Sequence, residues 1–235
     1  MIIFEIQGFN YQYPETAKDF SLQKWVDYLN NIKPLQPAYL QEIYSAETVE
    51  EKIRLFDEMP VAVRVGEFHP FICNEVAFWS GVNYSLLRKC NISTVETIWS
   101  NIQMAMVVEP EEFIGFEVDN EMYYLPEKFM TDSTIEDYAE SCAYEEAMTK
   151  VEQGEFEALP YVLAVLARKK IQGKKEGFDD YSIDLRAKLF KKKTSLHTLM
   201  QCAFFLQKLN NRLLQNSQIF MMATMISKLK QVQKN

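Results

Sequence analysis

The chain has 235 residues, of which 48% are hydrophobic and 25% are charged, an ordinary composition for a globular protein with ample core. It contains no apolar run of about 18 residues, so no membrane span is expected, and MIIFEI at the N-terminus has the pattern of a strand and not of a secretory signal. The four cysteines are widely spaced and form no C-x-x-C pair, which argues against a zinc site or a disulfide framework, and we expect no cofactor.

The net charge of −8 conceals an uneven distribution along the chain. Residues 1–167 contain 10 Lys and Arg against 29 Asp and Glu, a balance of −19. Residues 168–235 contain 15 Lys and Arg against 4 Asp and Glu, a balance of +11, and the two balances sum to −8. A basic C-terminal third can face nucleic acid, or it can face the acidic part of a neighbouring copy.

Two stretches of the chain repeat one pattern. Residues 2–15 read IIFEIQGFNYQYPE and residues 114–127 read IGFEVDNEMYYLPE, and six of the fourteen aligned pairs are identical where chance gives roughly one. In each copy alternating apolar residues precede a turn signal, and a second aromatic strand follows it. Gly8 aligns with Asn120, and both residue types tolerate the positive φ that a two-residue hairpin turn requires. The repeat therefore predicts two β-hairpins.

A helix signal follows each hairpin. Ser21 is a suitable cap for a helix of about residues 22–32, and Ser133, with a glutamate three residues later, gives the capping-box pattern ahead of a helix of about residues 134–150. A hairpin by itself is marginally stable in water and needs a surface to cover. We therefore expect each unit to be a hairpin laid against a helix.

The segment between the two units is mostly helical in pattern. Thr48 is the expected cap of a helix of about residues 48–58, which Pro60 would end. Residues 61–65 (VAVRV) have the composition of a short strand, and residues 66–92 show little periodicity.

The next signals lead to a boundary. Ser93 is the expected cap of a helix whose body is about residues 95–106, and the cluster EPEE at 109–112 is the best candidate for a boundary between lobes. We therefore expect an N-terminal lobe over residues 1–112 and a C-terminal lobe over residues 113–235.

The C-terminal lobe continues as helices after its hairpin. Pro160 predicts the start of an apolar helix, a second helix is expected at about residues 181–191, and two more at about 195–214 and 218–233. The whole order predicts an α+β protein that is predominantly helical, with two repeated β-hairpin–helix units each followed by helices.

The residues that usually carry chemistry are sparse. His69 and His197 are the two histidines of the chain, and we interpret both as structural. No G-x-S-x-G, P-loop or dinucleotide-binding pattern occurs. Adjacent carboxylates are interpreted as solvated surface, and the pair Asp179 and Asp180 as the negative charge at a helix N-terminus. We therefore expect a protein that is not an enzyme.

The basic segment over residues 168–193 has three interpretations. It can be a solvated face, an interface with an acidic protein surface, or a contact with nucleic acid, where each neutralised phosphate would contribute through counterion release. Aromatic residues are too thinly interleaved to predict a stacking platform for single strands. The candidate interface or nucleic-acid residues are Arg168, Lys169, Lys170, Lys174, Lys175, Lys191, Lys192 and Lys193.

The C-terminal lobe also carries a recognisable order of motifs. A Leu159-Pro160 start leads into YVLAVLARKK, then DDYS, Arg186, Leu189-Phe190 and AFFLQKL. Over about residues 113–214 this order resembles small neck, tail and tail-assembly proteins of tailed bacteriophages, including the crAss-like phages that infect Bacteroidales. The resemblance implies a virion or assembly protein that works as many copies around an axis, and it transfers no functional residues.

These observations lead to one expected function and two alternatives. We expect a virion structural protein, made in the host cytoplasm, that forms or joins a homo-oligomeric ring in the phage neck or tail beside tail or portal proteins. Acidic and basic lobes of neighbouring copies would dock, with Trp25, Trp79 and the methionine-rich end (Met221, Met222 and Met225, if they do not fill the core) as apolar anchors. The alternatives are a phage tail-assembly chaperone and a nucleic-acid-binding module in contact with DNA.

Overall fold

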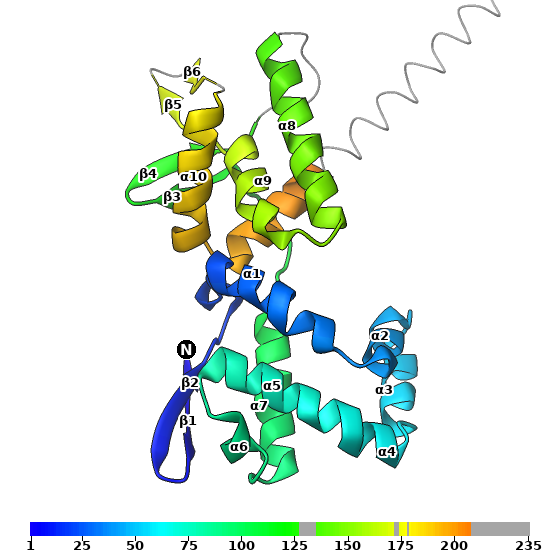
Figure 1. Cartoon of the computed structure of the whole chain (residues 1–235). Helices are drawn as coiled ribbons and strands as arrows, with labels where there is room; N and C mark the ends of the chain where they lie inside the picture. The colour runs from blue at the N-terminus through cyan, green and yellow to red at the C-terminus, as the bar shows by residue number, and fades with distance from the viewer. Residues whose placement is uncertain (127–134, 172–173, 178, 208–235) are drawn as a thin grey trace, which may run out of the picture.

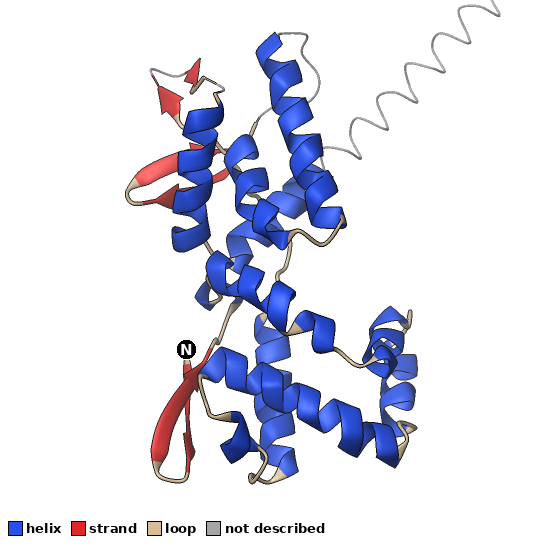
Figure 2. Ribbon diagram, viewed as in Figure 1, coloured by secondary structure: helices blue, strands red, loops and turns tan. Residues whose placement is uncertain are grey.

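The structure of the chain is a computed structural model, which describes residues 1–126, 135–171, 174–177 and 179–207 (Figure 1). The described chain is mostly helical, with two antiparallel hairpins and a third, shorter pair of strands (Figure 2). The prediction of a predominantly helical α+β fold with two repeated hairpin–helix units is confirmed.

The first half contains one hairpin and seven α-helices. They are β1 (Ile2–Ile6), β2 (Phe9–Tyr13), α1 (Leu22–Asn31), α2 (Ala38–Ser45), α3 (Val49–Asp57), α4 (Val61–Val63), α5 (His69–Ser80), α6 (Tyr84–Leu87) and α7 (Ile92–Ala105). Two short 3-10 helices, Ala17–Asp19 and Lys33–Leu35, flank α1, and a π-helix, Arg64–Phe68, joins α4 to α5.

The second half repeats the hairpin and adds further helices. They are β3 (Gly115–Val118), β4 (Glu121–Tyr124), α8 (Ile135–Glu152), α9 (Leu159–Leu166), β5 (Lys170–Ile171), β6 (Lys174–Lys175) and α10 (Asp180–Lys193). A 3-10 helix, Phe156–Ala158, precedes α9, and residues 196–207 are helical. The rest of the helix expected at 195–214 and the whole of that expected at 218–233 lie outside the described residues.

The two hairpins have the same turn and the same register. Both turn residues take positive φ in each copy, 52° at Gln7 and 82° at Gly8, then 52° at Asp119 and 63° at Asn120, as a type I′ turn requires. Phe4 faces Tyr11 across the first hairpin, and their aligned counterparts Phe116 and Tyr123 face each other across the second.

Several predicted helix ends are confirmed. The Ser21 hydroxyl accepts a hydrogen bond from the backbone N–H of Lys24, and Thr48 accepts one from Glu51, so these two side chains cap α1 and α3. Asp179 caps α10 in the same way. Ser133 lies outside the described residues.

The strand predicted at residues 61–65 is wrong. This segment is helical, as α4 and the π-helix, and runs into α5. A lone strand here would have no neighbour to pair its backbone groups, whereas the helix buries Phe68 fully, edge-on against Phe56 and Trp99. The β-branched composition of the segment is overridden by this packing.

Two further expectations also change. Residues 66–92, which show little periodicity in the sequence, contain α5 and α6. The cap of α7 is Asn91, whose side-chain oxygen accepts from the backbone N–H of Ser93, so the helix begins before the predicted Ser93 cap. Both residue types are good caps, and the pattern alone did not separate them.

Two hydrophobic cores lie on either side of α1. Figure 1 shows β1, β2 and α2–α7 on one side of this helix and β3–β6 with α8–α10 on the other. Leu22 and Val26 of α1 belong to the second core, Tyr28 belongs to the first, and Trp25 packs against both. A single helix therefore supplies side chains to both halves of the molecule.

The backbone also joins α1 to the end of α10. The N–H of Leu22 donates to the carbonyl oxygen of Thr194 at 2.9 Å, and the N–H of Leu196 donates to Phe20 at 2.8 Å. The predicted division into lobes 1–112 and 113–235 stays a prediction. Among the helices that the structure describes, none combines the length and apolar character needed to cross a bilayer.

Candidate protein-binding surface

Arg168, the first of the basic candidates, is an internal residue. Its side chain is 1% exposed. One guanidinium nitrogen forms an ion pair with Glu140 of α8, and another donates to the backbone oxygen of Glu176 at 2.8 Å. Arg186 of α10 reaches the Glu176 carboxylate at 2.9 Å, and burial lowers the pKa of this guanidinium. These groups hold α8, α9 and α10 together and are not available to a partner.

The side chains of Lys169 and Lys170, which follow Arg168 in the chain, lie over aromatic rings of the second hairpin. The Lys169 ammonium is 5.4 Å from the ring centroid of Tyr123 and 3.6 Å from the Glu121 carboxylate. The Lys170 ammonium is 4.8 Å from the ring centroid of Tyr124. Cations over aromatic faces are attracted by the ring quadrupole, so these two side chains cover the hairpin. Lys174 and Lys175 are the two residues of β6.

The last three lysines lie at the other end of α10. Lys191 pairs with Glu157, and Lys193 pairs with Asp119 of the second hairpin turn at 3.3 Å. Lys192 is exposed and, with Lys18, lines an open cavity of about 600 Å³. A helix of 14 residues separates this group from β5 and β6, a distance of roughly 20 Å. The eight candidates therefore form two groups, not one patch.

The charge division of the sequence is partly neutralised inside the second half. The carboxylates that form ion pairs with the basic residues all belong to the acidic stretch 113–167. They are those of Asp119, Glu121, Glu140 and Glu157. Residues 1–112 hold 16 Asp and Glu against 8 Lys and Arg. Within the described ranges no ion pair joins the basic candidates to this first stretch. The first half therefore keeps a net acidic surface.

The second hairpin is covered on its inner face and on one edge. Its facing aromatic residues, Phe116 and Tyr123, lie with ring centroids 5.0 Å and 4.8 Å from that of Phe190 on α10. On the β4 edge, the N–H of Tyr124 donates to Arg168 at 2.8 Å, and the N–H of Arg168 donates back to Tyr124 at 3.1 Å. Arg168 thus acts as a one-residue third strand.

The first hairpin has no such cover on its edge. Gln12 is the aligned counterpart of Tyr124, and it is exposed. Within the described chain the backbone groups of Asn10 and Gln12 that point away from β1 have no backbone partner. Ile3 is 71% exposed and Phe9 is 66% exposed. Both copies of the unit therefore pack against a core, but the outer edge of the second strand is paired in the second copy and unpaired in the first.

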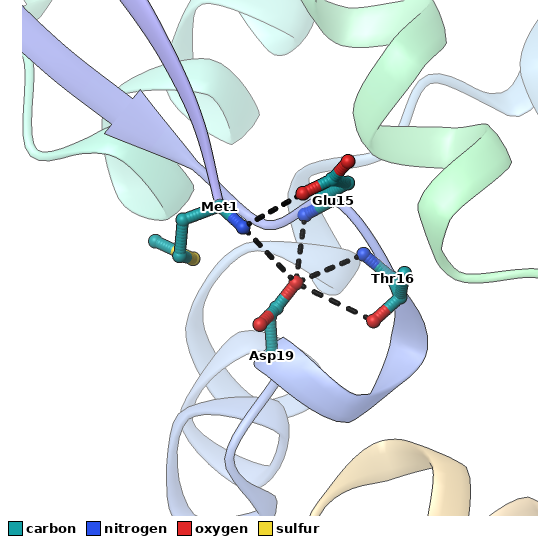
Figure 3. A network of polar contacts seen from close by, with 4 residues as sticks. All are labelled: Met1, Glu15, Thr16 and Asp19. Carbon is teal, nitrogen blue, oxygen red and sulfur yellow. Dashed lines mark hydrogen bonds and ion pairs between the residues drawn. The ribbon is translucent and has the colours of Figure 1, made fainter.

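The base of the open hairpin is held in a fixed position (Figure 3). The Met1 ammonium lies 3.1 Å from the Glu15 carboxylate and 3.5 Å from that of Asp19. Asp19 also accepts from the backbone N–H groups of Glu15 and Thr16, both at 3.0 Å. The hydrogen bond to Glu15 raises the pKa of the amino group. These contacts join the start of β1 to the turn that follows β2.

A buried carboxyl group lies inside the first core. Glu75 of α5 is 1% exposed and accepts hydrogen bonds from the Tyr28 hydroxyl and the Trp99 indole N–H, both at 2.5 Å. The Gln103 amide is 3.4 Å away. Burial raises the pKa of Glu75, and the three neutral donors oppose that shift. The network links α1, α5 and α7 and serves their packing.

The two tryptophans expected as apolar anchors pack within the chain. Trp79 is buried and Trp25 is half-buried, and their rings lie 6.3 Å apart in one aromatic cluster. The prediction that Trp79 anchors a neighbouring copy is therefore wrong, because this side chain already fills the chain's own core, and the same role for the half-buried Trp25 stays a prediction. The methionines Met221, Met222 and Met225 lie outside the described residues.

The two histidines each contact one glutamate, His69 with Glu96 at 3.3 Å and His197 with Glu111 at 3.4 Å. In the residues that the structure describes, no three His, Cys, Asp or Glu side chains gather as a metal site. Glu140 and Glu176 were not predicted as partners of the arginines. The one available signal is the residue type, since arginine suits buried ion pairs better than lysine does.

Comparisons of the chain with protein-family models, with curated proteins and with solved structures find no match. The functional inference therefore depends on the geometry of the chain and on the pattern of its sequence.

Proposed function

We propose that this chain is a non-enzymatic structural protein of a tailed bacteriophage, which forms or joins a homo-oligomeric ring in the neck or tail of the virion. One observation carries the proposal. The first hairpin has a free β2 edge where the same unit in the second half of the chain is paired with Arg168, and it has exposed apolar side chains at Ile3 and Phe9. Such an edge is a ready template for another chain.

The distribution of charge supports contact between copies. Residues 1–112 remain net acidic, while the basic residues of β5 and β6 lie in the other half of the molecule. A head-to-tail contact joins two different surfaces and closes into a ring when the rotation allows it. Charge complementarity would raise the association rate and select the orientation, while apolar contacts such as those of Ile3 would supply affinity.

The phage assignment draws on the sequence pattern of the C-terminal half. Two residues of that pattern have clear roles in the fold, because Phe190 packs under the second hairpin and Arg186 binds Glu176. The pattern thus describes a core that supports a hairpin. Neighbouring tail or portal proteins would be the other partners of such a ring.

The mass of the purified chain in solution tests the proposal. Light scattering over a range of concentrations should give a closed multiple of the 27.5 kDa chain mass. Raising the salt from about 50 mM to 500 mM should slow assembly, because exposed charges are screened beyond a few ångströms. A monomer at every concentration would exclude the ring, and equal assembly rates at both salts would exclude charge steering.

A tail-assembly chaperone is the second candidate, because exposed apolar residues on a hairpin also suit temporary binding of an aggregation-prone partner. Purified particles separate the two functions, since a ring protein stays in the virion and a chaperone leaves it. Nucleic-acid binding has less support, because Arg168, Lys169, Lys191 and Lys193 pair with carboxylates of the chain itself.

A further inference from the structure

We propose that the free edge of β2 receives the basic strand pair β5–β6 of a second copy as an added strand. The inference rests on the proposed homo-oligomer and names the two segments that would join its copies. The receiving residues are Asn10 and Gln12, and the donated strand is β6, Lys174–Lys175.

The second hairpin shows what the open edge lacks. There, Tyr124 exchanges two backbone hydrogen bonds with Arg168, at 2.8 Å and 3.1 Å, and Lys169 lies over the adjacent Tyr123 ring. Tyr11 is the counterpart of Tyr123, and it is half-buried with no cation over its ring among the described residues. The missing element is therefore an extended segment that carries basic residues.

The register of the first hairpin leaves the required groups unpaired. In an antiparallel pair, residues alternate between those that bond to each other and those that point their N–H and C=O groups outward. The pair Ile6 and Phe9 flanks the two-residue turn and bonds across it, so Asn10 and Gln12 point outward from β2. Their groups recur along one edge at about 7 Å, the repeat of a β-ladder.

The strand pair β5–β6 offers a matching edge. Ile171 and Lys174 flank its turn, and the N–H of Glu176 donates to Lys169 at 2.9 Å, so the backbone groups of Lys175 point away from β5. Within the described chain these groups have no backbone partner. Ile171 is 58% exposed, as expected for a strand pair that has no further strand packed beside it.

Charge and position favour a second copy as the donor. β5 and β6 carry Lys170, Lys174 and Lys175, whereas the receiving hairpin carries Glu5 opposite Asn10. Figure 1 shows β1–β2 and β5–β6 at opposite ends of the molecule, so one copy can donate at one end and receive at the other. This arrangement propagates head to tail, as a ring requires.

Paired variants of the full chain test the contact. Gln12→Pro removes an outward N–H from the β2 edge, and Glu5→Pro removes one from the opposite, β1 edge of the same hairpin as a matched control. On the donor side, Lys174→Glu with Lys175→Glu is matched by Lys150→Glu with Lys188→Glu, which makes the same charge change on exposed residues of α8 and α10.

We expect Gln12→Pro to weaken association about tenfold, because it removes one backbone hydrogen bond of the contact. The Lys174/Lys175 double variant keeps its backbone groups but replaces attraction to the acidic first half with repulsion, and we expect a loss of similar size. The two controls should stay within about twofold of the parent chain. A one-to-one mixture of the two defective proteins should form dimers that grow no further, because each retains one intact surface.

Hydrogen exchange gives an independent readout. The amide of Tyr124 should be protected at every concentration, whereas that of Gln12 should become protected only in the oligomer. An oligomer in which Gln12 still exchanges freely, or in which both proline variants act alike, overturns this contact and leaves the ring proposal standing. A protein that is monomeric at all concentrations overturns both, and protection of Gln12 in the monomer shows that the chain covers this edge itself.

Discussion

The two hairpins of this chain share turn type, register and aromatic pairs, yet they have different surroundings. In the second, Phe116 and Tyr123 are buried against α10 and the β4 edge is paired with Arg168. In the first, Tyr13 reaches Asn101 of α7, but no strand among the described residues lies beside the β2 edge. The local pattern determines the hairpin itself, and residues far along the chain determine whether its edge is free.

The two halves also differ in the partners of a buried carboxylate. Glu140 of α8, in the second half, pairs with Arg168, while Glu75, in the first core, meets neutral donors. The first arrangement places a full charge opposite a full charge, and the second leaves a single carboxyl in an apolar setting. The halves should therefore respond differently to substitution and to pH.

The largest effect is expected at the buried ion pair. Arg168→Met should lower the free energy of unfolding by about 3–5 kcal/mol, because it leaves Glu140 buried without its cation. Urea denaturation followed by circular dichroism measures the change. The double variant Arg168→Met with Glu140→Leu should recover most of the loss, and no recovery would mean that the arginine acts mainly through its other contacts.

The aligned phenylalanines compare the two hairpins directly. Phe116→Ala should cost about 3 kcal/mol of stability, because the ring is buried against Phe190. Phe4→Ala should cost about half as much, because Phe4 is half-buried. Equal losses in urea denaturation would show that the first hairpin is as well covered as the second.

A third comparison uses the aligned pair Ile3 and Gly115. A Cβ on Gly115 would lie 2.1 Å from the carbonyl oxygen of Tyr123. Gly115→Ala should therefore cost about 1–3 kcal/mol, whereas Ile3→Ala at the exposed position should change stability by less than about 0.5 kcal/mol. Thermal unfolding of the two variants measures both, and a tolerated alanine at 115 would show that the strands move apart there.

The smallest expected effect is a slope with pH. Glu75 has an ordinary pKa of 4.5, and burial raises it in the folded chain. Between these two values the folded state keeps a proton that the unfolded state has lost, so stability falls as pH rises through this window, by up to about 1.4 kcal/mol per pH unit. Subtracting the profile of Glu75→Gln from that of the parent isolates this slope, and Glu42→Gln, at an exposed position, should leave the profile unchanged.

The hairpins and many helix ends could be predicted from the sequence, because their signals are local. Gly8 and Asn120 indicate the turns, and Ser21, Thr48 and Asp179 indicate the caps. The helical state of residues 61–65 could not be predicted, because it depends on burial of Phe68 against distant aromatic rings. Local composition carries no record of that contact.

The candidate surface was predicted less well than the fold. The count of lysines and arginines indicates a basic segment, but it does not show that Arg168 is internal or that Lys193 meets Asp119. Those facts depend on which acidic residues the fold brings near. The open edge at Gln12 has a sequence signal only through the repeat, since its aligned partner Tyr124 is paired.

Helix α1 has a mechanical consequence. Its ten residues insert Leu22 and Val26 into one core and Tyr28 into the other, and its start is bonded to Thr194. A force applied to the first hairpin would be transmitted through this helix to the second half of the chain, and not through one linker segment alone. The two halves should therefore move as one rigid body, and thermal unfolding should show one transition and not two.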